Sequence, residues 1–126
     1  MSAYFGGDLF ETPQYAAENV YNAIKTLAGN GFTDFFVPNI PNIGETLIYH
    51  GTAYEPYISG WCQAFNFALA GYLNALAMDP LYASANFMTF DTYSLITDMF
   101  NNPDKYGFAS VNDIFWSDGY HPSNQT

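Results

Sequence analysis

Two short apolar runs, separated by a long helical pattern, constrain the fold of this chain most strongly. Residues 32–37 are mostly apolar and rich in aromatics between Gly31 and Pro38, and residues 87–91 form a second run of this kind. Such runs are typical of strands buried on both faces of a parallel sheet. Parallel neighbours need a crossover connection, and the helical pattern between the two runs provides one. The sequence therefore predicts an α/β fold.

In three other segments the apolar residues recur at the spacing of helices. The first predicted helix starts at Thr12-Pro13, where a capping hydroxyl precedes a proline, and stops at Gly29-Asn30-Gly31. The second covers about residues 53–78, with a break expected near Gly60, and the third covers residues 92–101.

The predicted sheet has about three parallel strands, because residues 2–5 form a further candidate strand. The alternation of strands and helices predicts right-handed crossovers and helices on both faces of the sheet. Three strands are few for this architecture, and neither edge of such a sheet is obviously closed. We therefore expect residues 1–126 to form one partial domain that covers its apolar edge or face in a homodimer or higher oligomer.

The charge of the chain excludes several classes of function. Lys25 and Lys105 are the only cations against 12 acidic residues, and the formal net charge is −10. Nucleic-acid binding depends on Lys and Arg that neutralise phosphates, so nucleic acid is excluded as a partner, and so is P-loop phosphoryl transfer. The chain has two histidines and the single Cys62, so neither a zinc site nor another metal or cofactor is expected.

The hydropathy pattern predicts neither a membrane span nor a leader segment. Polar residues and a glycine interrupt the longest apolar helical stretch, residues 58–76, which falls short of a membrane span. No basic run precedes an apolar run at the N-terminus, so no secretory signal is expected. The compartment stays open.

Asp118 and His121 form the constellation that most directly predicts chemistry. They are three residues apart in a loop flanked by glycine and proline. An imidazole acts as a general base near neutral pH when a carboxylate accepts its Nδ1–H and fixes the tautomer. The same spacing also fits a capping aspartate beside a surface histidine, so the spacing alone leaves both interpretations open.

Residues 115–122, Phe-Trp-Ser-Asp-Gly-Tyr-His-Pro, resemble the last sequence block of the SGNH/GDSL family of esterases and lipases. Other stretches resemble the family in the same order along nearly the whole chain. They are residues 30–41 with Gly44, Phe65-Asn66 with Ala68-Leu69, residues 90–95, and residues 102–108. The resemblance implies an incomplete three-layer α/β/α, flavodoxin-like fold, corresponding to the C-terminal half of an SGNH hydrolase.

The resemblance also implies an activity, the hydrolysis of small-molecule or lipid carboxylic esters of short to medium acyl chain. His121 matches the general base and acid of the family, and Asp118 matches the residue that orients it. Residues 4–9 resemble the family's third block without its Asn, which puts Gly7 and Asp8 near the oxyanion position. Asn39, from the Val-Pro-Asn loop, joins them at the active-site rim.

The nucleophile is not identified by the sequence. The family's nucleophilic Ser block, its second-block Gly and its final helix have no counterpart here, and no serine lies in a Gly-x-Ser-x-Gly elbow. The serines are Ser2, Ser59, Ser84, Ser94, Ser110, Ser117 and Ser123. Water activated by the Asp118–His121 pair and attack by the Asp8 carboxylate are the alternatives, and a rival alignment puts Asp8 in the serine position itself.

A second hypothesis is a non-catalytic fragment or self-association module of a GDSL hydrolase. The absence of a recognisable nucleophile favours it. Three other features are weaker candidates for a site. His50 is expected at a rim or in packing, Cys62 in the core, and Tyr49, Tyr54 and Tyr57 either along an apolar cleft or on a generic aromatic surface.

Overall fold

The structure, a computed structural model, describes residues 11–115, 118–124 and 126. It divides into two compact units. Unit 1 comprises residues up to 38 together with residues 63–90, and unit 2 comprises residues 39–62 and 91–126. The long helix α2 (Glu55–Met78) contributes to both units. Each unit is described by itself.

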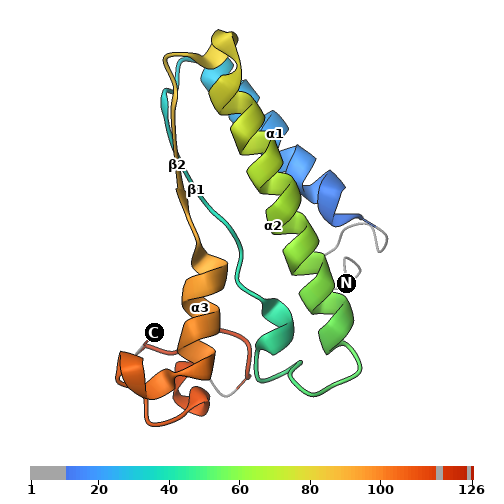
Figure 1. The fold of residues 1–126 in the computed structure, drawn as a ribbon, viewed down its shortest axis with the longest axis vertical. Helices are drawn as coiled ribbons and strands as arrows, with labels where there is room; N and C mark the ends of the chain where they lie inside the picture. The colour runs from blue at the N-terminus through green and yellow to red at the C-terminus, as the bar shows by residue number, and fades with distance from the viewer. Residues whose placement is uncertain (1–10, 116–117, 125) are drawn as a thin grey trace. The chain divides into compact units, whose positions relative to one another are not determined.

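Unit 1 contains α1 (Pro13–Gly29), β1 (Asp34–Pro38), the C-terminal part of α2 and β2 (Asn86–Phe90). Helix α1 begins where the Thr12 hydroxyl accepts the backbone N–H of Tyr15, so the predicted Thr-Pro start is confirmed. The rings of Tyr21 and Tyr72 stack between α1 and α2, with centroids 4.8 Å apart. Figure 1 shows both helices on the same side of the two strands.

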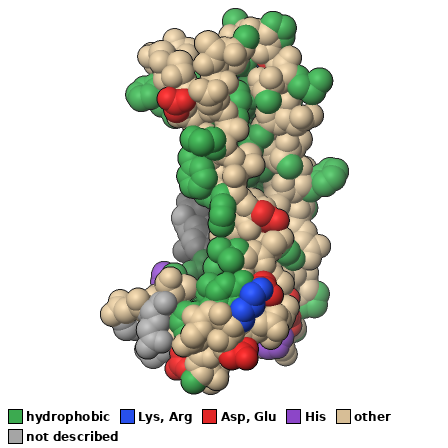
Figure 2. All heavy atoms as spheres, turned by 60° about the vertical axis from the view of Figure 1, so that its left-hand side comes forward, with side chains coloured by type: hydrophobic (Ala, Val, Ile, Leu, Met, Phe, Trp, Pro, Cys, Tyr) green, Lys and Arg blue, Asp and Glu red, His purple; other side chains and the backbone are tan. Residues whose placement is uncertain are grey.

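Strands β1 and β2 pair in parallel, with Phe36 opposite Met88 and Pro38 opposite Phe90. These side chains share one face of the sheet, because alternate residues of a strand point the same way. The prediction that both strands are buried on both faces is wrong for this part of the chain. Phe36 is 62% exposed, Met88 54% and Phe90 46%. Hydrophobic side chains lie at the surface in the view turned toward the strands (Figure 2). The physical reason is that α1 and α2 lie on one side of the strands (Figure 1), and Phe35, which points away from the Phe36 face, is only 7% exposed.

Unit 2 contains the start of α2, helix α3 (Thr92–Asn101) and three short 3-10 helices. These are η2 (Ile43–Glu45), η4 (Pro103–Tyr106) and η5 (Val111–Ile114). Its core is built from Met99 of α3 with Phe108, Ile114 and Phe115, which are buried together. The segment that follows this core carries the predicted site.

The described residues form a small α/β arrangement of three α-helices and a two-stranded parallel sheet. The third helix is confirmed with the predicted bounds, and both predicted strands are confirmed within one or two residues. The break near Gly60 is wrong, since α2 runs through it without interruption. The candidate strand at residues 2–5 lies outside the described residues. Within the described residues, no helix combines the length and hydropathy that crossing a membrane requires.

Candidate functional site

The structure brings Asp118 and His121 into direct contact. Nδ1 of His121 lies 2.6 Å from Oδ2 of Asp118. The carboxylate therefore accepts the Nδ1–H and leaves Nε2 with its lone pair, the form in which an imidazole acts as a general base. The His121 side chain is 66% exposed and that of Asp118 is 48% exposed, so both are accessible to solvent.

Backbone groups fix the carboxylate in this position. Oδ1 of Asp118 accepts the N–H of Tyr120 at 2.9 Å and the N–H of His121 at 3.0 Å. The hydrogen bond from His121, followed by these backbone bonds, lowers the pKa of the Asp118 carboxyl to about 2. Asp118 is therefore ionised at neutral pH, and it serves as the capping aspartate and as the partner of the imidazole at once. The contact that would orient the imidazole and the capping bonds are thus both present, and the catalytic role of the pair stays a prediction.

A second segment docks onto the loop between the two residues. The N–H of Ile48 donates to the carbonyl oxygen of Gly119 at 3.0 Å. Gly119 has a φ of 71°, and a Cβ there would lie 3.1 Å from Ile48 N and 3.1 Å from Leu47 Cβ. Glycine is therefore favoured here by its conformation and by the close approach of residues 47–48.

Aromatic rings lie next to His121 in a series of edge-to-face contacts. The rings of Tyr49 and Tyr120 meet edge to face with centroids 6.4 Å apart, and Tyr120 meets the His121 ring at 5.0 Å. Burial raises the pKa of the Tyr120 hydroxyl, so it is neutral at neutral pH. Of the three tyrosines considered from the sequence, Tyr49 contacts Tyr120, the residue before His121. Tyr54 and Tyr57 are exposed.

The chain on either side of the site is anchored to the core of unit 2. Phe115 and Pro122 form an antiparallel bridge, and the N–H of Ser123 donates to the carbonyl oxygen of Ile114 at 2.7 Å. Ile114 is almost completely buried. The segment that carries His121 is thus tied to a packed residue and is not a free loop.

Asn39 connects the loop after β1 to the start of α3. Its Nδ2 donates to Oδ1 of Asp91 at 3.0 Å, and its Oδ1 accepts the N–H of Tyr93 at 2.8 Å. Hydrogen bonds from Ser94, and then from Asn39, lower the pKa of the Asp91 carboxyl. These bonds give Asn39 a structural task, and its predicted place at the active-site rim stays a prediction.

The other predicted residues are not brought to this pair by any described contact. Gly7, Asp8, Ser2 and Ser117 lie outside the described residues. The hydroxyls of Ser94 and Ser123 bond to Asp91 Oδ2 and to the Asp113 carbonyl oxygen. The remaining serines lie elsewhere in the described residues. Ser59 lies against Gly44, Ser84 is exposed, and Ser110 caps η5.

Metal chemistry has no evident ligand set in the part of the chain that the structure describes. No group of three or more His, Cys, Asp or Glu side chains within it is placed to hold an ion. Cys62 is buried, as predicted, and burial raises the pKa of its thiol. It is therefore an unreactive thiol at neutral pH, because the thiolate is the nucleophile.

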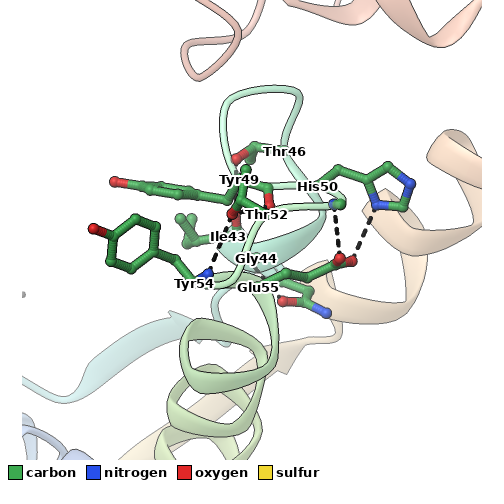
Figure 3. A network of polar contacts seen from close by, with 10 residues as sticks. Ile43, Gly44, Thr46, Tyr49, His50, Thr52, Tyr54 and Glu55 are labelled. Atoms are coloured by element: carbon green, nitrogen blue, oxygen red, sulfur yellow. Dashed lines mark hydrogen bonds and ion pairs between the residues drawn. The ribbon is translucent and has the colours of Figure 1, made fainter.

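The structure adds a second histidine–carboxylate contact that the sequence analysis missed. Nδ1 of His50 lies 3.0 Å from Oε1 of Glu55, and Oε2 accepts the N–H of Gly51 at 2.8 Å (Figure 3). The bond from Gly51, more than that from His50, lowers the pKa of the Glu55 carboxyl. Gly51, with a φ of 77°, is the local signal of the turn that brings the two side chains together.

Comparison with known proteins finds a distant similarity to an esterase/lipase. A GDSL esterase/lipase of Arabidopsis thaliana is 28% identical to this chain over 111 residues. The matched segment covers 84% of this chain and 29% of that protein, so the chain spans less than a third of the relative's length. No family model matches the chain. The likeness supports a relationship to the GDSL esterases and lipases and is too distant to establish membership.

Proposed function

We propose that this chain carries the acid–base half of a carboxylic-ester hydrolase of GDSL type. The contact between Asp118 and His121 carries the proposal, because it orients an exposed imidazole with Nε2 available as a base. The related Arabidopsis protein, described as an esterase/lipase, supports the same chemistry. On this proposal, the β1–α2–β2 crossover is part of a three-layer SGNH sheet.

His121 moves the proton in the proposed reaction. Nε2 takes a proton from the attacking hydroxyl as its oxygen forms a bond to the ester carbonyl carbon, and the carbonyl electrons move to oxygen. The protonated imidazole then returns the proton to the departing alkoxide as the C–O bond breaks. The ionised Asp118 stabilises the imidazolium between these steps.

The attacking hydroxyl is proposed to come from water when the chain acts alone. The Ser94 and Ser123 hydroxyls are bonded to other groups, and the family's serine block has no counterpart in this sequence. A reaction without an aligned nucleophile and full oxyanion hole is slow, since one missing oxyanion donor costs about 10²–10³ in turnover. We therefore propose activated short-chain esters, such as nitrophenyl acetate or butyrate, as the substrates that reveal it.

The test replaces Asp118 by Asn and compares it with Asp98→Asn. Asp98 is also an ionised carboxylate of unit 2, with its own pKa lowered to about 2 by Lys105, Tyr106 and Asn102. Asp118→Asn should lower the hydrolysis rate at least about tenfold by favouring the wrong imidazole tautomer, whereas Asp98→Asn should not. Equal rates in the two variants would contradict the proposal.

A second candidate function is self-association, and the uncovered face of the sheet favours it. Phe36, Met88 and Phe90 lie together on that face and are about half exposed or more. An exposed apolar patch of this kind is typical of an association surface. We propose a second copy of the chain as its partner, and light scattering of the purified chain at micromolar concentration tests this: a monomer would contradict it.

A further inference from the structure

We propose that Glu55 is a positioning residue for the Asp118–His121 pair, acting through the segment of residues 46–52. The inference rests on the proposed function, because it concerns the same imidazole. Glu55 makes no described contact with Asp118 or His121. Every contact that connects them lies within unit 2.

The first link ties Glu55 to the end of the segment. Glu55 lies in the first turn of α2, where helical geometry fixes its backbone. Its two carboxylate oxygens bind His50 Nδ1 and the Gly51 N–H, at 3.0 Å and 2.8 Å (Figure 3). A carboxylate that holds two neighbouring residues restricts both the ring and the backbone of the turn. The Glu55 side chain is 26% exposed, so it is partly covered by its surroundings.

The second link fixes the segment internally. The carbonyl oxygen of Thr46 accepts the N–H groups of Tyr49 and His50, and the Thr46 hydroxyl donates to the Ile43 carbonyl oxygen at 2.6 Å. Thr52 closes the other end, because its hydroxyl donates to the Tyr49 carbonyl oxygen at 2.6 Å. Residues 46–52 thus form one hydrogen-bonded turn whose position depends on both ends (Figure 3).

The third link joins this turn to the proposed site. Ile48 donates its N–H to Gly119, and the Tyr49 ring packs against Tyr120. Gly119 and Tyr120 are the two residues between Asp118 and His121. A shift of the turn therefore moves the backbone that holds the carboxylate and the imidazole at their 2.6 Å contact. Small displacements of a catalytic group are costly, and about 1 Å can cost 10²-fold in rate.

The experiment compares Glu55→Ala, Glu55→Gln and the control Asp104→Asn. Asp104 is an exposed carboxylate of unit 2, so its variant matches the loss of one negative charge. We expect Glu55→Ala to lower kcat for nitrophenyl butyrate about tenfold with KM within about twofold, and to shift the NMR signals of the His121 ring. Glu55→Gln keeps an oxygen for the Gly51 N–H and should recover at least half of the wild-type kcat. Asp104→Asn should change none of these.

The outcomes separate this inference from the proposed function. Unchanged kcat and unchanged His121 ring signals in Glu55→Ala would overturn the positioning role, as would equal effects of Asp104→Asn. If the wild-type chain hydrolyses no ester, the proposed function fails, and the ring signals still decide whether Glu55 positions His121. If Glu55→Ala does not fold, His50→Ala carries the test with a smaller expected shift of the His121 ring signals, because it removes one of the two contacts and leaves the Gly51–Glu55 bond. Unchanged ring signals in His50→Ala would then overturn the positioning role.

Discussion

Replacing Gly119 by Ala tests how the loop of the proposed site is held. Gly119 has a φ of 71°, and an alanine in that left-handed conformation costs about 1–2 kcal/mol. The added Cβ would also lie 3.1 Å from Ile48 N and from Leu47 Cβ, so residues 47–48 must move. Overpacking of this kind costs a further 1–3 kcal/mol or so. We expect a loss of about 2–5 kcal/mol in the free energy of unfolding.

Gly107→Ala is the matched control. Gly107 also has a positive φ, 86°, and a Cβ there meets no atom within 4 Å. It therefore reports the conformational cost alone, about 1–2 kcal/mol. Urea unfolding of both variants, followed by circular dichroism, gives the two values. We also expect ester hydrolysis to fall in Gly119→Ala only, because Ile48 loses its position on the loop.

The reasoning is refuted if the two alanine variants lose the same stability within about 0.5 kcal/mol. That result would mean that residues 47–48 yield to the new methyl group without cost, so that they do not hold the loop between Asp118 and His121.

Three further predictions follow from the charges and the exposed face. The folded state lowers the pKa of Asp118 to about 2, so the ionised carboxylate stabilises the fold at pH values above its unfolded pKa near 4. This stability is lost as the pH falls through about 2. Urea midpoints should therefore fall less steeply between about pH 4 and pH 2 in Asp118→Asn than in the wild-type chain. Because the formal net charge is −10, an anionic ester should be hydrolysed about fivefold more slowly than its neutral analogue at about 10 mM salt, and less than about twofold more slowly at 0.15 M. Hydrolysis rates of a nitrophenyl hemisuccinate at the two salt concentrations test this, and equal ratios would contradict it. Phe36→Lys, on the exposed sheet face, should shift the chain toward monomer in light scattering, whereas Phe32→Lys, outside the strands, should do so less.

Local signals in the sequence were sufficient to predict where the helices α1 and α3 begin. Thr12 and Pro13 define the start of α1, and the Asp91 carboxylate caps α3 where the pattern begins. Each of these starts depends on hydrogen bonds within a few residues, which sequence spacing determines. The continuity of α2 through Gly60 was not predicted, because the roughly 1 kcal/mol cost of glycine in a helix is outweighed by the residues around it.

The exposure of the strands and the surroundings of the site depend on contacts between distant residues. Phe36 is a residue type that is usual in buried strands, yet its exposure depends on which elements cover its face of the sheet. The Asp118–His121 contact was predictable because only two residues separate the partners. The hydrogen bond of Ile48 with Gly119 joins residues far apart in the sequence, so no local sequence pattern predicts it.

The rate of nitrophenyl butyrate hydrolysis by His121→Ala, beside His50→Ala, tests the central claim most directly. Both histidines are exposed, and both contact a carboxylate through Nδ1. If His121 is the general base, His121→Ala abolishes the activity of the purified chain. His50→Ala should keep measurable turnover, at a level reduced by no more than about tenfold through the positioning effect of that contact. Full activity in His121→Ala would contradict the account and assign the turnover to another site.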